Sequence, residues 1–206
     1  NPFPEYRDPL NLRAGNPKLL PEMIHSVEFG YKWQNDNFSL VPSLYYRYKK
    51  NGFTSVTIPL NDSVLLTTEQ NLSNDQSAGL EIIFSAKAGK FFSSNLSTNF
   101  FYNQIDAADL GFIGKKTIVS MSTNFNATFT ITKTTVAQVS SNFRSARLTP
   151  QGKSYASFVF NAGLRQDLFK KKASIILTAS DLFKTLRNKN EFVTTGLQQV
   201  SFGRRD

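Results

Sequence analysis

The sequence predicts an all-β fold, an antiparallel meander of long strands. Through most of the chain, apolar residues stand at every second position, as Phe125, Ala127 and Phe129 do, with Asn126 and Thr128 between them. In a strand, this period of two places one set on each face. The other two observations are the unusual length of these stretches and the regular alternation of short and long connectors. A soluble sandwich shares the alternation, so length and connectors decide where the apolar face lies.

The alternating stretches are too long for ordinary globular strands, which average roughly 5–6 residues. They match the roughly 9–11 tilted residues that cross a bilayer. The predicted strands cover 24–33, 38–49, 64–72, 76–87, 91–104, 117–131, 135–146, 155–168 and 173–183, with a weaker strand near 192–202.

The connectors alternate in length along the chain. Short joins are predicted at 34–37, 88–90, 132–134 and 170–172, and long ones at 49–63, 105–116, 146–154 and 184–190. Outer-membrane barrels have short turns on the periplasmic side and long loops outside. The sequence therefore predicts one partial barrel domain over 1–206, with an extended extracellular-type loop at 1–22 and barrel strands at 23–206.

Three segments depart from the regular pattern. Prolines crowd 1–22, which argues against a strand there, and Pro42 within 38–49 predicts a bulge or local break. Residues 54–58 are expected to extend a hairpin above the membrane. The polar residues of 192–202 predict an irregular segment that does not pair with 24–33 to close a barrel.

The amino-acid composition argues against several other classes of protein. No apolar run is long enough for a spanning helix, and the polar, proline-rich start is no signal peptide, so we expect a processed product or a piece of a longer chain. The net charge of +9 lies mostly in turns and loops, which gives no reason to expect nucleic acid as a partner. With no cysteine and only His25 as histidine, we expect no enzyme activity, metal site or cofactor.

The first part of the chain carries an ordered set of short motifs. A Tyr-x-Asp-Pro loop is followed by Gly-Asn-Pro-x-Leu-x-Pro-Glu and then by a strand of the type Glu-x-Gly-Tyr. The residues are Tyr6, Asp8, Pro9, Gly15, Asn16, Pro17, Leu19, Pro21, Glu22, Glu28, Gly30 and Tyr31. This set resembles the barrel of TonB-dependent outer-membrane receptors, in the outer-membrane β-barrel branch common in Bacteroidetes. Downstream, Gly79-Leu80-Glu81 and Ser180-Asp181-Leu182-Phe183 are similar to later strands of that family.

The resemblance implies the C-terminal part of a barrel in the bacterial outer membrane. Its plug domain is absent here, and the chain stops at 203–206 without the family's closing aromatic strand. The implied partners are outer-membrane lipid, the remaining barrel strands and plug of the parent chain, TonB through that plug, and an unknown nutrient. The implied function is nutrient import, of a metal chelate, glycan or peptide.

The polar face of the strands is expected to line the lumen, where its side chains are candidates for contact with plug or substrate. These candidates are Glu28, Lys32, Arg47, Glu81, Asn95, Asn99, Asn124, Asn142, Arg144 and Arg165. A different class fits the same alternation: a soluble or surface-attached all-β binding module, such as a carbohydrate-binding sandwich. Extraction separates the two, because only a barrel needs detergent.

Overall fold

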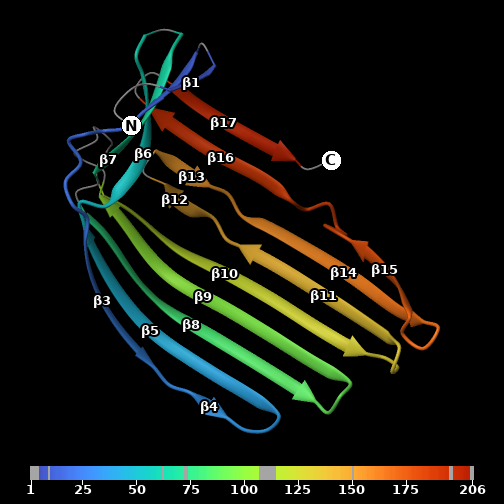
Figure 1. Cartoon of the computed structure of the whole chain (residues 1–206). Helices are drawn as coiled ribbons and strands as arrows, with labels where there is room; N and C mark the ends of the chain where they lie inside the picture. Colours follow the sequence, from blue (N-terminus) through green and yellow to red (C-terminus); the bar gives the residue numbers. More distant parts are fainter. Residues whose placement is uncertain are drawn as a thin grey trace.

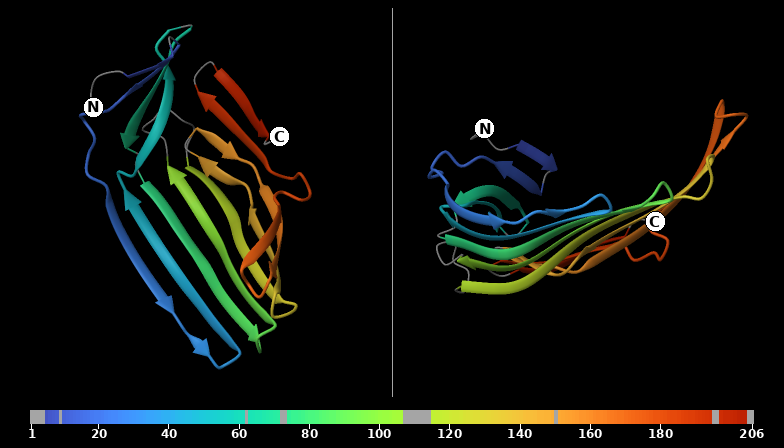
Figure 2. Two further views of the ribbon diagram at one scale, coloured as in Figure 1. Left: turned by 45° about the vertical axis from the view of Figure 1, so that its right-hand side comes forward. Right: turned by 90° about the horizontal axis from the view of Figure 1, so that it is seen from below.

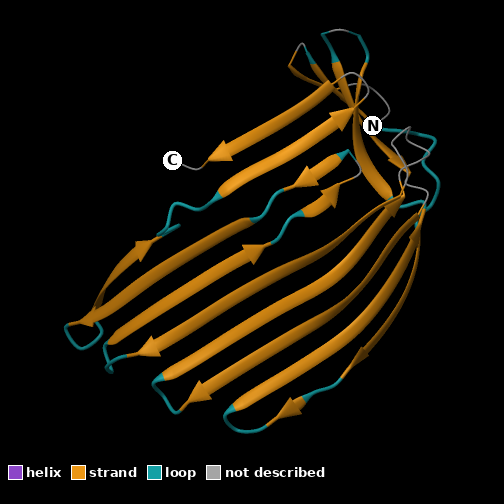
Figure 3. Ribbon diagram, turned by 180° about the vertical axis from the view of Figure 1, so that it is seen from behind, coloured by secondary structure: helices purple, strands orange, loops and turns teal. Residues whose placement is uncertain are grey.

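The computed structural model describes residues 5–8, 10–61, 63–71, 74–106, 115–149, 151–194 and 197–204, and their regular structure is all strand (Figure 3). Within these residues, no helix is long and apolar enough to cross a membrane. Antiparallel pairing dominates, as the sequence predicts. The strands form one large sheet and two smaller ones.

The large sheet follows chain order, β15-β14-β11-β10-β9-β8-β5-β3, with the short β4 also paired to β5. Its strands are β3 (Met23–Gly30), β4 (Trp33–Gln34), β5 (Phe38–Lys50), β8 (Asn74–Ala88), β9 (Phe92–Asp106), β10 (Lys115–Thr130), β11 (Thr135–Arg144), β14 (Ser157–Leu168) and β15 (Ala173–Ala179). At 15 or 16 residues, β8, β9 and β10 confirm the predicted strand length. The sheet is curved like a trough rather than flat (Figure 2).

The register sorts this sheet into an apolar and a polar face. Leu80 of β8 pairs with Phe100 of β9, which also pairs with Met121 of β10. One position along, Glu81 pairs with Asn99, and Asn99 pairs with Ser122. Successive side chains of a strand point to opposite faces, so apolar and polar rows alternate across the sheet.

No second layer covers the apolar face. Val27 is 72% exposed, Phe29 73% and Val119 74%. A sandwich would bury such residues between its sheets. This exposed apolar surface is what a lipid-facing wall requires.

Short and long connectors lie at opposite ends of the sheet (Figure 1). The short turns include three successive left-handed residues, Phe169, Lys170 and Lys171, with φ of 49°, 57° and 70°. At the other end, long connectors form the two smaller sheets. The predicted alternation of connectors is therefore confirmed in the described residues, and most of the connector predicted at 105–116 lies outside them.

The first small sheet has the order β1-β2-β7-β6, from β1 (Glu5–Asp8), β2 (Asn11–Ala14), β7 (Leu65–Asn71) and β6 (Phe53–Pro59). The extended loop predicted for 1–22 is thus wrong for 5–8 and 11–14. These strands are only 4 residues long each, so they fit between the prolines of the sequence. β6 and β7 form the hairpin expected from 54–58. The strand predicted at 64–72 is found as Leu65–Asn71 and belongs to this sheet rather than to the large one.

The second small sheet has the order β12-β13-β16-β17, from β12 (Arg147–Thr149), β13 (Gly152–Ser154), β16 (Arg187–Thr194) and β17 (Leu197–Arg204). The irregular segment predicted for 192–202 is wrong, because β16 and β17 pair from Arg187↔Arg204 to Thr194↔Leu197. The partner of β16 is β13, which supplies a ladder that the chain-order pattern does not reveal. The described residues contain no ladder between 24–33 and 192–202, in agreement with the prediction that these segments do not close a barrel.

Pro42 leaves the β5–β8 ladder continuous, where it pairs with Ile82. The break lies on its other side: Tyr31 donates its backbone N–H to the Pro42 carbonyl at 3.0 Å, but proline has no N–H to return. There β3 ends at Gly30, and pairing resumes at Trp33. The predicted local break therefore falls in the neighbouring strand.

Candidate functional site

The polar face of the large sheet gathers most of the predicted lumen residues. Glu28 lies opposite Tyr45, Arg47 opposite Ser77, and Glu81 opposite Asn99. By strand alternation, Asn95, Asn124, Asn142, Arg144 and Arg165 share this face. Lys32 lies in the interruption between β3 and β4, outside the ladder. Contact of these residues with plug or substrate stays a prediction.

Hydrogen bonds between strands engage the amides of this face. Asn142 donates its side-chain N–H to Asn124, and the Ser85 hydroxyl donates to Asn95 Oδ1 at 2.8 Å. Because their polar atoms are paired, these asparagines have a structural role in holding neighbouring strands together.

Tyr45 and Gly79 form the most closely packed part of the polar face. The Tyr45 hydroxyl donates to Asn99 Oδ1 at 3.2 Å. A Cβ added at Gly79 would lie 2.6 Å from the Tyr45 hydroxyl oxygen and 2.6 Å from the Phe100 carbonyl oxygen. The absence of a side chain at Gly79 therefore lets the Tyr45 ring lie against the sheet. The Arg47 guanidinium stands 4.9 Å from the centre of the same ring.

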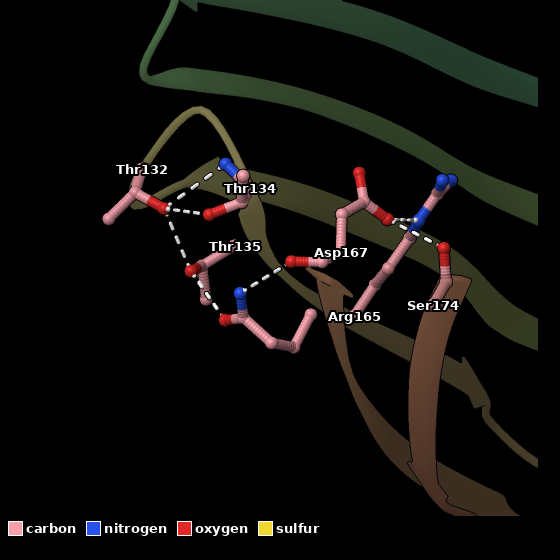
Figure 4. A network of polar contacts seen from close by, with 7 residues as sticks. Thr132, Thr134, Thr135, Arg165, Asp167 and Ser174 are labelled. Carbon is pink, nitrogen blue, oxygen red and sulfur yellow. Dashed lines mark hydrogen bonds and ion pairs between the residues drawn. The ribbon is translucent and has the colours of Figure 1, made fainter. Parts of the chain in front are cut away.

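Arg165 belongs to a polar network near the short turns (Figure 4). Its Nε–H donates to Asp167 Oδ1 at 2.8 Å, and the Ser174 hydroxyl donates to the same oxygen at 2.7 Å. Beside it, the Thr135 hydroxyl donates to Gln166 Oε1 at 2.7 Å. These bonds tie β14 to its two neighbours, so Arg165 has a structural partner that the sequence pattern did not indicate.

The long connectors are joined by a side-chain amide that sequence reasoning missed. Gln151, only 6% exposed, accepts the Thr57 N–H at 2.8 Å and donates to the Thr57 carbonyl at 2.9 Å. The Gln151 carbonyl also accepts the Val193 N–H at 2.7 Å. We call these bonds the Gln151 clasp; it links β6 to the β13–β16 ladder across 94 residues of sequence.

A basic pocket lies where β11 and β14 meet the second small sheet. Four basic residues are among those that line it: Arg144, Arg147, Arg187 and Lys189. Only Arg144 was among the predicted candidates, because the other three lie on connectors or on β16, away from the alternating strands. Tyr155 also lines it and donates its hydroxyl to Glu191 Oε2 at 3.0 Å; this hydrogen bond raises the pKa of Tyr155.

A curved antiparallel sheet with one exposed apolar face, one polar face and loops of alternating length defines the wall of a transmembrane β-barrel. A family model described as the outer membrane protein beta-barrel family matches residues 1–205. The chain belongs to this family. No curated protein matches it.

Membership places the protein in the bacterial outer membrane, with its apolar face against lipid. Since long loops of such barrels face outward, the basic pocket and the Gln151 clasp lie at the extracellular end. The network of Arg165 lies at the periplasmic end.

Proposed function

We propose that the chain is part of the barrel of a TonB-dependent receptor, which imports a scarce nutrient such as a metal chelate, glycan or peptide. The observation that carries this proposal is the ordered motif set running from Tyr6 to Tyr31 at the start of a barrel wall. No catalytic role accompanies it. The soluble-module alternative has no support in an outer-membrane family whose apolar face is uncovered.

Two features of the architecture suit import. The polar face offers a hydrated wall for a plug, stiffened by amide pairs such as Asn124 with Asn142. The edges at β3 and β15 each have one partner strand among the described residues, and lipid does not tolerate unpaired edges. Further strands of the parent barrel would complete them, and the plug would contact TonB.

Nutrient uptake in deletion strains tests the proposal. A strain without the gene and a strain without TonB are compared with wild type for uptake of ferric chelates, glycans and peptides at limiting concentration. The proposal predicts that one nutrient class is lost in both strains and that the cloned gene restores it in the first. Uptake that needs this gene but proceeds without TonB would contradict the proposal. Normal uptake of every tested nutrient in the strain without the gene would contradict it as well.

A further inference from the structure

The basic pocket is a compact space of about 160 Å³ at the extracellular end of the polar face. Of its basic lining residues, Arg144 belongs to the end of β11, Arg147 to β12, and Arg187 and Lys189 to β16. No acidic residue is among those that line it. Distant parts of the sequence thus bring one sign of charge together.

In the described part of the chain, no carboxylate forms an ion pair with Arg144, Arg147 or Arg187. The nearby carboxylate of Glu191 accepts the Tyr155 hydroxyl, and the Lys189 ammonium stands 4.3 Å from the centre of the Tyr155 ring. Because like charges repel, gathering the three arginines is unfavourable unless an anion enters.

The chemistry of the lining selects the kind of anion. Guanidinium groups present planar pairs of N–H donors, which match the oxygens of phosphate and carboxylate. Ser154 adds a hydroxyl, although it donates to Asn190 Oδ1 at 2.8 Å. Arg144 pairs with Ser157 on the polar face, so the pocket opens from the water-facing side rather than from lipid.

We infer that this pocket binds a phosphate or carboxylate group of a soluble ligand. The inference rests on the proposed import function, of which it names the substrate class: an anionic nutrient. Lipopolysaccharide phosphates share this chemistry, but they reach the protein from the apolar face. The water-facing position of Arg144 favours the soluble source.

Binding is measured by calorimetry with the protein extracted from outer membranes in detergent and freed of lipopolysaccharide. The probes are inorganic pyrophosphate and citrate. We expect one of them to bind once per protein and to bind more weakly as salt is raised. The paired substitution Arg147→Gln with Arg187→Gln should weaken it at least about tenfold, the usual effect of losing charge-assisted hydrogen bonds.

Two further variants separate binding from folding and from total charge. Arg147→Lys with Arg187→Lys keeps the charge and should retain part of the affinity. Lys170→Gln with Lys171→Gln removes the same charge from a short turn at the other end and should change affinity less than about twofold. Circular dichroism verifies that each variant is folded.

The inference is overturned if neither probe binds or if the Arg147→Gln/Arg187→Gln variant binds like wild type. It is also overturned if the Lys170→Gln/Lys171→Gln variant loses as much affinity as the Arg147→Gln/Arg187→Gln variant. It is also overturned if the arginines affect binding of lipopolysaccharide alone. The measurement needs no TonB, so its failure leaves TonB-dependent uptake standing, and binding without such uptake contradicts only the proposed function.

Discussion

At the scale of single residues, the polar face is built by close packing as well as by hydrogen bonds. Gly79 stands between Tyr45 and Phe101 in the ladder, and the space that a side chain would fill holds the Tyr45 ring. Glycine in a strand normally weakens it, since it loses more conformational freedom on folding. Here that cost is offset by aromatic packing across strands.

Replacing Gly79 by alanine should destabilise the protein by about 1–3 kcal/mol, the usual cost of overpacking. The added Cβ meets backbone at Phe100, which cannot move aside as a flexible side chain can. Gly163→Ala is the matched control, since its Cβ would lie 3.8 Å from the nearest atom. It should be neutral or slightly stabilising. Urea unfolding in liposomes measures both, and equal effects would refute the packing argument.

At the scale of elements, the extracellular connectors form a connected layer rather than separate loops. β2 pairs in parallel with β7, and the Gln151 clasp joins β6 to the second small sheet. Val56, beside the clasp, is only 2% exposed. This layer places the basic pocket on a fixed support.

Removing the clasp should loosen that layer without disturbing the large sheet. Gln151→Ala removes the partner of the half-buried Thr57 N–H and carbonyl, at a cost of about 1–3 kcal/mol. Hydrogen exchange should therefore speed up at the amides of β6 and stay unchanged in β9 and β10. Gln138→Ala, at an exposed strand position, is the control. Unchanged exchange at the Thr57 amide would show that the clasp does not stabilise this layer.

The sequence could predict the large sheet because the period of two is a local property of each strand. Phe125 and Asn126 reveal their faces without knowledge of any partner strand. The small sheets depend on pairing between distant segments, as β16 pairs with β13, and local polarity at 192–202 therefore misled the prediction. The basic pocket was missed for the same reason: Arg144 and Arg187 meet only in the folded chain.

At the scale of the whole molecule, the sheet separates lipid on its apolar face from water on its polar face. Large apolar side chains such as Val27, Phe29 and Val119 are exposed on one face, and the other face carries Glu28, Arg47 and Glu81. Sheet edges at β3 and β15 leave the trough open within the described chain. This arrangement is stable in a bilayer, because exposure of Val27 or Val119 to lipid is favourable.

An arginine on the apolar face should therefore be costly. Phe125→Arg, near the middle of β10, should destabilise the protein by about 2–4 kcal/mol in liposomes. Asn126 is the adjacent residue on the polar face. Asn126→Arg should destabilise the protein only slightly, because water hydrates the new charge. Unfolding by urea compares the two, and equal losses would contradict the assignment of faces.

The most direct test of the membrane wall is the accessibility of adjacent faces in a bilayer. The chain has no cysteine, so single spin labels can be attached at Phe100→Cys and Asn126→Cys. In liposomes, the label at position 100 should be relaxed mainly by oxygen, which concentrates in lipid. The label at position 126 should be relaxed mainly by a water-soluble nickel complex. Equal relaxation of both labels by oxygen, or the reverse preference, would contradict the account.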